Sequence, residues 1–410
     1  MPSIAFVAAH DSEFKWCHAT SRRFEQAGWD VSFHTVMSDF KATPEQVRNS
    51  GLDFSALRIL TMTEALQAWS TENAVVFVTN GDLCEKYLLA LRQATSSSTT
   101  RPIMIAAYCG VVVTNHLAGY LARASADIVC ANSPFDAALF SAAAAELKLP
   151  EKQILLTGLS ILPEVIKPMR TGKIDTIIYA DQAAIPPSPN DRFYIYQSLA
   201  EYARRHPERT VLVKPRFRPG ETSYKKATYS PEEFFAQTRK IPTNLKITYE
   251  PIVHLLPKID LLITISSTAA LEAICEGCRV AIVADIGLKE AFGSPMFVGS
   301  GLLRTFAQIS DDDLGSASRE WLRQHEIERP GELLRQINEM HKANISGQMP
   351  RIQSAYLEAR SHFTSKPYSF SAQKKGRKQR KITVRRPAAI RAFKWIKSRI
   401  KKIISGNLRR

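Results

Sequence analysis

The chain is constrained most by an alternation of short apolar runs and helical patterns that occurs twice along its length. The apolar runs, rich in Val, Ile and Ala, have the length of buried strands, and the segments between them place apolar residues at helical spacing. Strands that alternate with helices predict parallel sheets covered by helices on both faces. The alternation stops at residues 163–173, which hold two prolines and a glycine, and restarts near residue 174. The sequence therefore predicts an α/β protein with two doubly wound, Rossmann-like domains.

The same patterns give the expected elements. Strands are expected at residues 3–9, 29–36, 56–61, 74–79, 102–107, 127–131, 153–157, 176–180, 210–215, 246–249, 261–265 and 279–284. Helices are expected at residues 11–27, 63–70, 82–95, 116–124, 134–147, 191–205, 231–238, 252–258, 269–276, 312–324, 331–343 and 350–363. This order predicts a first domain over residues 1–165, a second domain over 174–345 and a closing helix over 346–365.

The positive charge is concentrated at the C-terminal end. The 410 residues carry a formal net charge of +16, and residues 366–410 hold 17 of the 55 Lys and Arg but no Asp or Glu. The first 365 residues are close to neutral, with 38 basic against 39 acidic residues. A neutral body without an aromatic and basic platform disfavours a protein whose folded domains bind nucleic acid.

Within this tail, residues 374–386 form a basic run, and residues 388–405 place Ile, Phe and Ala on one helical stripe with Lys and Arg around it. The second pattern predicts a basic amphipathic helix that lies in the headgroup plane of an anionic membrane. We therefore expect a peripheral protein on the inner face of the cell membrane. The alternative is a basic tail that binds any acidic partner, including RNA.

The six cysteines are scattered through expected strands and helices, as in proteins of a reducing cytosol. Cys275 and Cys278 have the spacing of a metal or redox pair, but no second pair and no histidine pair accompanies them, and buried thiols are the expected role. The N-terminus lacks the basic region of a signal peptide. These features predict a cytoplasmic protein that uses neither a metal nor another cofactor.

An anion site is predicted where the strand at 261–265 runs into Ser266, Ser267 and Thr268. Their hydroxyls precede an expected helix and would cap it. The start of a helix offers a phosphate unpaired N–H groups and the positive end of the helix dipole. The alternative is an ordinary helix cap.

Countercharge for an anion is predicted at the end of the strand at 210–215. Lys214, Arg216 and Arg218 alternate there, so a period of two would point all three toward the same side. Pro215 indicates that the strand ends at this point, and the alternative is a solvated basic strand end. Gln182 follows the strand at 176–180, at the rim where such folds bind ligands, and either reads the edge of a base or is an exposed amide.

These motifs carry a resemblance. Val213-Lys214-Pro215-Arg216 and, about fifty residues later, the segment ISSTAALEA at 265–273 resemble the nucleotide-binding motifs of GT-B glycosyltransferases of bacterial surface polysaccharide synthesis. Those enzymes include bacterial sialyltransferases, capsule Kdo transferases and polyol-phosphate polymerases; Lys214 departs from the histidine of the sialyltransferases. The N-terminal half resembles a family of uncharacterised bacterial glycosyltransferases, through DSEFKW at 11–16 and the segments 102–112 and 126–133.

The resemblance implies a GT-B fold whose two domains face a cleft that takes a donor and an acceptor. It implies transfer of a sugar from a nucleotide-activated donor, with a CMP-linked acidic sugar favoured, to a saccharide or lipid-linked acceptor in capsule or lipopolysaccharide synthesis. Side chains and a helix dipole, instead of a metal ion, would stabilise the leaving phosphate. The residues expected to bind the nucleotide, from these motifs and from the strand-end pattern that adds Gln182 and Arg218, are Gln182, Lys214, Arg216, Arg218, Ser266, Ser267, Thr268 and Glu272.

An acceptor hydroxyl must lose a proton as it attacks the anomeric carbon, and a positioned carboxylate or histidine does this work. The candidate bases follow expected strands of the first domain: Asp11, Asp82, His10 and His116. Asp11 and Asp82 are alternatively helix caps, and His116 is alternatively structural. Glu13, Lys15 and Trp16 lie on the first turns of the helix that begins near Asp11, and we expect them to contact the acceptor.

Two other functions remain open at this point. A GT-B epimerase would invert or hydrolyse a nucleotide sugar without an acceptor. A nucleic-acid-binding protein would use the basic tail.

Overall fold

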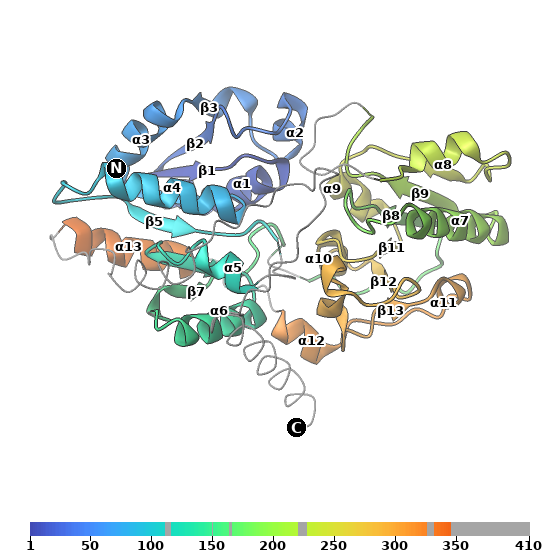
Figure 1. Cartoon of the computed structure of the whole chain (residues 1–410). Coiled ribbons are helices and arrows are strands. Elements are labelled where there is room, and N and C mark those ends of the chain that lie inside the picture. Colours follow the sequence, from blue (N-terminus) through green and yellow to red (C-terminus); the bar gives the residue numbers. More distant parts are fainter. Residues whose placement is uncertain (111–115, 150, 164–165, 220–227, 326–331, 346–410) are drawn as a thin grey trace, which may run out of the picture. The chain divides into compact units, whose positions relative to one another are not determined.

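The computed structural model describes residues 1–110, 116–149, 151–163, 166–219, 228–325 and 332–345. The expected helices over 350–363 and 388–405 lie outside the described residues, as does the basic run over 374–386. Two parallel sheets organise the described part of the chain, and helices pack against each of them (Figure 1). The prediction of two doubly wound, Rossmann-like domains is confirmed.

The first sheet has seven parallel strands in the order β3-β2-β1-β4-β5-β6-β7. The strands are β1 (Ser3–Val7), β2 (Asp30–Val36), β3 (Leu57–Leu60), β4 (Ala74–Phe77), β5 (Ile103–Ala106), β6 (Ile128–Ala131) and β7 (Ile154–Leu156). The helices of this part are α1 (Asp11–Gln26), α2 (Pro44–Asn49), α3 (Met62–Thr71), α4 (Gly81–Ala94), α5 (His116–Leu121) and α6 (Pro134–Glu146), with 3-10 turns η1 (Phe54–Ala56) and η2 (Glu151–Gln153). The strand order reverses between β1 and β4, which is where folds of this kind bind ligands.

The second sheet repeats this arrangement with six strands in the order β10-β9-β8-β11-β12-β13. They are β8 (Thr176–Ala180), β9 (Thr210–Lys214), β10 (Leu245–Ile247), β11 (Leu261–Thr264), β12 (Arg279–Val283) and β13 (Leu303–Arg304). Its helices are α7 (Pro189–Arg205), α8 (Pro231–Gln237), α9 (Ile252–Leu255), α10 (Ala269–Cys275), α11 (Phe306–Ser310) and α12 (Arg319–Gln324), with 3-10 turns η3 (Leu256–Lys258), η4 (Glu290–Phe292) and η5 (Ser294–Phe297). Here the order reverses between β8 and β11.

The central strands are buried on both faces. Side chains alternate along a strand, so successive residues of β1 enter opposite apolar layers. Phe6 packs in one layer against Phe24 of α1, with ring centroids 5.9 Å apart. Val7 belongs to the other layer, together with Trp69 of α3. Burial on both sides explains why these parallel strands appear in the sequence as continuous apolar runs.

The final described helix, α13 (Glu332–Ile345), returns to the first sheet. It contacts β5 and β7, and the ring of its His341 lies 5.5 Å from that of Trp29, centroid to centroid. Leu333 and Ile337 supply its buried apolar face. The expected range of the second domain, 174–345, therefore includes a helix that packs against the first sheet.

The expected helix over 312–324 is wrong in its first half. Instead of continuing a helix, Asp312 has a φ of 55°, and α12 begins only at Arg319, after the cap residue Ser318. Gly315 explains the break: a Cβ at this position would lie 1.9 Å from the carbonyl oxygen of Gly301, so the chain must pass there as glycine.

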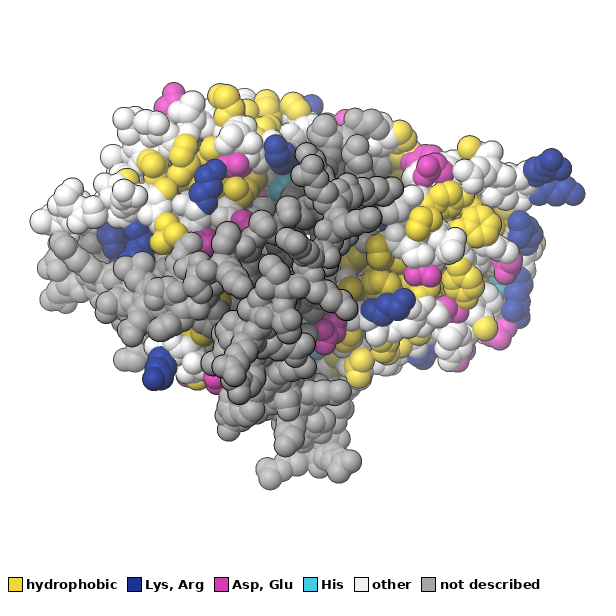
Figure 2. All heavy atoms as spheres, viewed as in Figure 1, with side chains coloured by type: hydrophobic (Ala, Val, Ile, Leu, Met, Phe, Trp, Pro, Cys, Tyr) yellow, Lys and Arg dark blue, Asp and Glu magenta, His cyan; other side chains and the backbone are white. Residues whose placement is uncertain are grey.

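The surface of the described residues mixes charges of both signs. Lys and Arg side chains are interspersed with Asp and Glu in the view of Figure 2. This distribution agrees with the near-neutral composition of the first 365 residues. Among the residues that the structure describes, no helix has the length and apolar character needed to span a bilayer.

Candidate functional site

The turn between β1 and α1 lies at the carboxyl rim of the first sheet, beside the reversal of strand order. Glu13 Oε2 accepts hydrogen bonds from the backbone N–H groups of Ala9 (2.8 Å) and His10 (3.0 Å). Burial raises the pKa of Glu13 to about 7 and lowers the pKa of His10. Asp11 is the first residue of α1, and its side chain is 28% exposed. Because the cap residue of α1 is His10, the alternative role of Asp11 as a cap is not what the structure shows.

At the carboxyl rim of the second sheet, Gln182 joins the ends of β8 and β11. Its side-chain oxygen accepts a hydrogen bond from the backbone N–H of Ser266 (3.0 Å), and its amide nitrogen donates to Ser266 Oγ (3.3 Å). These two strands flank the reversal of strand order. Gln182 is therefore held at the predicted ligand-binding rim, and it is tied to the neighbouring strand end instead of being an isolated exposed amide.

A buried ion pair behind Gln182 was not anticipated from the sequence. Arg192 Nη1 donates to both carboxylate oxygens of Asp181, each at 3.0 Å, and the hydroxyl of Tyr196 donates to Asp181 Oδ2 (2.9 Å). Arg192 Nη2 donates to the carbonyl oxygens of Gln182 and Ala183. Burial raises the pKa of Asp181 to about 6, against the opposing charge of Arg192. The network fixes the loop that carries Gln182.

The three basic residues at and beyond the end of β9 have different partners. The strand ends at Lys214, in agreement with the strand end expected at Pro215. Lys214 Nζ lies 3.3 Å from the carbonyl oxygen of Pro215. Arg216 Nη2 lies 2.6 Å from Asp11 Oδ2. Arg218 Nη2 lies 3.7 Å from Glu45 Oε1 of α2. The two arginines thus contact carboxylates of the first domain, and the common direction of all three side chains stays a prediction.

A second ion pair joins α1 to α10. Lys15 Nζ lies 2.5 Å from Glu272 Oε2, and the Glu272 side chain is only 10% exposed. Nearby, a Cβ added at Gly110 would lie 3.4 Å from Thr268 Cγ2, so the segment after β5 also approaches the start of α10. Residues predicted separately for the acceptor and for the nucleotide, Lys15 and Glu272, are therefore in direct contact.

The three hydroxyls before α10 do not all cap the helix, and that part of the prediction is wrong. Thr268 is the cap residue, but its side chain makes no capping hydrogen bond. Ser267 Oγ accepts from the backbone N–H of Ala269 (3.2 Å). Ser266 is buried and donates to the carbonyl oxygen of Phe292, because the strand end turns its side chain toward Gln182 and away from the helix axis.

The expected contact of Trp16 with an acceptor also differs from what the structure shows. Trp16 is 0% exposed and belongs to the apolar layer of the first domain, so its predicted contact with an acceptor is wrong. The helical period that places Cys17 and Phe24 against the sheet also turns Trp16 inward. The charged side chain of the neighbouring residue, Lys15, points outward instead.

Asp82 and His116 are the remaining candidate bases. Asp82 is exposed on the first turn of α4, and the cap of that helix is Asn80, whose Oδ1 accepts from the backbone N–H of Leu83 (3.1 Å). The alternative role of Asp82 as a cap is thus not observed. His116 begins α5, and its side chain lies outside the described residues.

Cys275 and Cys278 are both buried, as expected of packed thiols. Cys278 Sγ lies 3.2 Å from the carbonyl oxygen of Leu256, a contact of a packed thiol. Within the described ranges, no three His, Cys, Asp or Glu side chains gather closely enough to hold a metal ion.

Comparison with known proteins extends these observations. The family described as "Putative glycosyltransferase (DUF6716)" matches residues 4–340. No curated protein matches the chain.

Several solved structures share the architecture. The UDP-GlcNAc 2-epimerase from Methanocaldococcus jannaschii has a TM-score of 0.51 at 11% identity, with 83% of this chain and 99% of that chain covered. MnaA from S. aureus, solved with UDP, has a TM-score of 0.51 at 12% identity, with 90% and 100% covered. The spinosyn forosaminyltransferase SpnP has a TM-score of 0.47 at 11% identity, with 83% and 99% covered. The fold is GT-B, which this chain shares with the UDP-GlcNAc 2-epimerase and with MnaA.

Proposed function

The chain belongs to the family described as "Putative glycosyltransferase (DUF6716)", and we propose that it transfers a sugar from a nucleotide-activated donor to a saccharide or lipid-linked acceptor. The observation that carries the proposal is the ion pair of Asp11 with Arg216, at 2.6 Å. It brings a candidate base from the rim of the first sheet to a candidate phosphate ligand from the rim of the second.

The donor nucleotide would bind at the rim of the second sheet. Lys214 and Arg216 would contact the phosphates, with Arg218, Glu272 and the segment 266–268 around them. Arginine binds carboxylates and phosphates through the same fork of N–H groups, so an incoming phosphate can replace Asp11 on Arg216. Gln182, held by Ser266, would meet the base or the ribose.

In this arrangement, the exchange of partners prepares the base. Once the phosphate takes Arg216, the carboxylate of Asp11 is released to accept the proton of the acceptor hydroxyl. The hydroxyl oxygen forms a bond to the anomeric carbon as the bond from that carbon to the phosphate oxygen breaks. The negative charge left on the nucleotide is met by Lys214 and Arg216, which stabilises the departing group.

The finer assignments rest on the sequence motifs. The Lys214-Pro215 strand end and the ISSTAALEA segment support a CMP-linked acidic sugar as donor and a role in capsule or lipopolysaccharide synthesis. The basic composition of residues 366–410 supports a peripheral place on the inner face of the membrane, next to a lipid-linked acceptor. Catalysis is proposed to need no metal, because side chains supply the countercharge.

Donor turnover measured with and without an added saccharide tests the reaction type. The proposal predicts that release of the nucleotide from CMP-, UDP-, GDP- or CDP-sugars depends on the acceptor and persists in EDTA. The fold shared with 2-epimerases favours one alternative, an epimerase. Acceptor-independent conversion of the donor, with no glycosylated product, would establish that alternative instead.

A further inference from the structure

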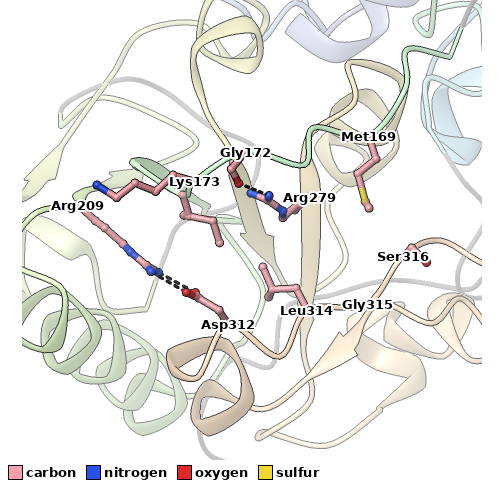
Figure 3. Close-up of a pocket in the computed structure, with 10 residues that line it drawn as sticks. Met169, Gly172, Lys173, Arg209, Arg279, Asp312, Leu314, Gly315 and Ser316 are labelled. Atoms are coloured by element: carbon pink, nitrogen blue, oxygen red, sulfur yellow. Dashed lines mark hydrogen bonds and ion pairs between the residues drawn. The ribbon is translucent and has the colours of Figure 1, made fainter.

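A cavity of about 420 Å³ lies at the amino end of the second sheet, opposite the rim described above (Figure 3). Arg209 directly precedes β9, and Arg279 is the first residue of β12. Lys214 lies at the other end of β9, five residues from Arg209, which corresponds to roughly 16 Å along a strand. The cavity is therefore separate from the proposed nucleotide site.

Three cationic side chains and one carboxylate line this cavity: Lys173, Arg209, Arg279 and Asp312. Arg209 and Asp312 neutralise each other, since the two terminal nitrogens of Arg209 lie 2.7 and 2.6 Å from the carboxylate oxygens. These hydrogen bonds lower the pKa of Asp312. Lys173 and Arg279 remain as the cations available to a ligand.

Lys173 is held only weakly. Its Nζ lies 3.3 Å from Asp175 Oδ1, but the two side chains are 69% and 63% exposed. Exposed pairs of this kind contribute little, because water screens the charges and the long side chain loses freedom. Lys173 can therefore turn toward an anion without the loss of a strong contact.

Arg279 has no ion pair among the residues that the structure describes. Its Nη2 donates to the carbonyl oxygen of Gly172, as drawn in Figure 3, and its Nη1 is buried without an acceptor. A buried donor without a partner is unfavourable, and a guanidinium prefers an oxyanion as its partner. The charge of Arg279 helps to lower the pKa of Asp312 in the same cavity, but that carboxylate makes its hydrogen bonds to Arg209, so the guanidinium of Arg279 can still take an oxyanion.

The apolar residues that line the cavity indicate the chemistry of the ligand beyond its anionic group. Met169, Ile174 and Leu314 line the cavity with apolar atoms. The volume lies within the range of small-molecule sites, which combine apolar walls with a few polar anchors. Met169 and Lys173 belong to the segment between the two sheets, so a ligand would contact this segment and the second sheet together.

We propose that this cavity binds a phosphate monoester, with the phosphate on Arg279 and Lys173 and the organic body against Met169, Ile174 and Leu314. A phosphate monoester is close to a dianion at neutral pH and so matches two cations. A sugar phosphate and a nucleoside monophosphate share this chemistry.

Calorimetry on the full chain tests the proposal, with glucose 1-phosphate, UMP and inorganic phosphate as probes. One of the esters is expected to bind, and Arg279→Gln is expected to weaken that binding about tenfold or more, the effect of losing one charge-assisted contact. Arg239→Gln removes an exposed arginine of the same domain and should change nothing. Lys214→Ala, at the other end of the sheet, should leave this binding intact.

Each calorimetric result either supports or overturns the proposed phosphate monoester site. Stronger binding of glucose 1-phosphate identifies a sugar phosphate site, and stronger binding of UMP that survives Lys214→Ala identifies a nucleotide site. The proposal is overturned if no probe binds, if inorganic phosphate binds as well as both esters, or if Lys214→Ala abolishes the binding. If Arg279→Gln does not fold, Lys173→Ala replaces it: the exposed lysine should lower the affinity about threefold or more, and unchanged affinity would equally overturn the proposal.

Discussion

Asp11 Oδ2 and Arg216 Nη2 lie 2.6 Å apart although 205 residues separate them in the sequence. The pair joins the first turn of α1 to the chain just beyond β9. The sequence predicts a different role for each partner, Asp11 as a base and Arg216 as a phosphate ligand. Their contact pairs the candidate base with the candidate phosphate ligand, and the proposed mechanism requires a substrate to separate them.

Substitution of Asp11 tests its role as the base. Asp11→Asn keeps the size of the side chain but cannot accept a proton, so turnover should fall about a hundredfold or more. Nucleotide affinity should not fall, because the variant removes only the competitor of the phosphate for Arg216. Steady-state kinetics and calorimetry on the same preparation measure both. Turnover within a few-fold of the wild type would remove Asp11 as the base and make Asp82 the next residue to test.

The contact of Lys15 with Glu272 predicts energetic coupling between the two sheet domains. Their charged atoms are 2.5 Å apart and Glu272 is largely buried, so the two substitutions should not be additive. A double-mutant cycle of Lys15→Met and Glu272→Gln, measured by urea unfolding, should give a coupling free energy of about 1–2 kcal/mol. The exposed pair of Lys173 with Asp175 is the matched control and should couple by less than about 0.5 kcal/mol. Additive effects at Lys15 and Glu272 would show that the contact contributes nothing to the fold.

Glu13 predicts a pH dependence of stability with a defined sign. Burial raises its pKa from an ordinary 4.5 to about 7, so the folded chain keeps a proton that the unfolded chain releases between these values. The stabilisation from the protonated carboxyl is complete below pH 4.5 and is lost as the pH rises toward 7.

The variant Glu13→Gln cannot titrate but retains an oxygen for the N–H groups of Ala9 and His10. Between about pH 5 and 8 the wild type should lose roughly 2–3 kcal/mol of unfolding free energy more than the variant does. Urea unfolding at the two pH values provides the comparison. Parallel pH profiles would mean that the two hydrogen bonds keep Glu13 ionised throughout.

The parallel strands were predictable because burial on both faces leaves continuous apolar runs. Every expected strand is present with bounds that differ by no more than two residues, such as β9, which ends at Lys214 instead of Pro215. The short helix α2 offers little apolar periodicity and is absent from the expected helices, although the capping box of Thr43 and Gln46, with Pro44 at the first helical position, is a signal that could have revealed it.

The contacts of the candidate site were less predictable. The spacing of residues shows which of them share a strand or a helix face. The contact of Asp11 with Arg216, however, depends on how segments about 200 residues apart dock against each other, which spacing does not show. The buried pair of Asp181 and Arg192 was hidden for a related reason: the arginine lies on the amphipathic helix α7, where an exposed position is the usual expectation. The burial of Trp16 was not expected because the adjacent Lys15 and the acidic residues Asp11 and Glu13 suggest a polar surface, although Phe14 in the same motif is buried.

The tail provides a prediction that does not depend on the catalytic site. Full-length protein should float with vesicles that contain anionic lipid, and a chain that ends at residue 365 should stay in solution, because the excess charge lies beyond that residue. The shortened chain should keep its activity on a water-soluble acceptor. Equal flotation of both chains would refute the membrane anchor, and a selective loss of RNA binding in the shortened chain would favour a nucleic-acid partner.

The central claim is that a nucleotide binds at the carboxyl rim of the second sheet, and calorimetric titration with CMP, UDP, GDP and CDP tests it most directly. One of these nucleotides should bind, and Lys214→Ala and Ser267→Ala should each lower that binding by about 1–3 kcal/mol, the contribution of a charged or charge-assisted hydrogen bond. Lys240→Ala, an exposed lysine of the same domain, should leave the affinity unchanged. Unchanged affinity in both Lys214→Ala and Ser267→Ala, or binding of none of the four nucleotides, would contradict the account.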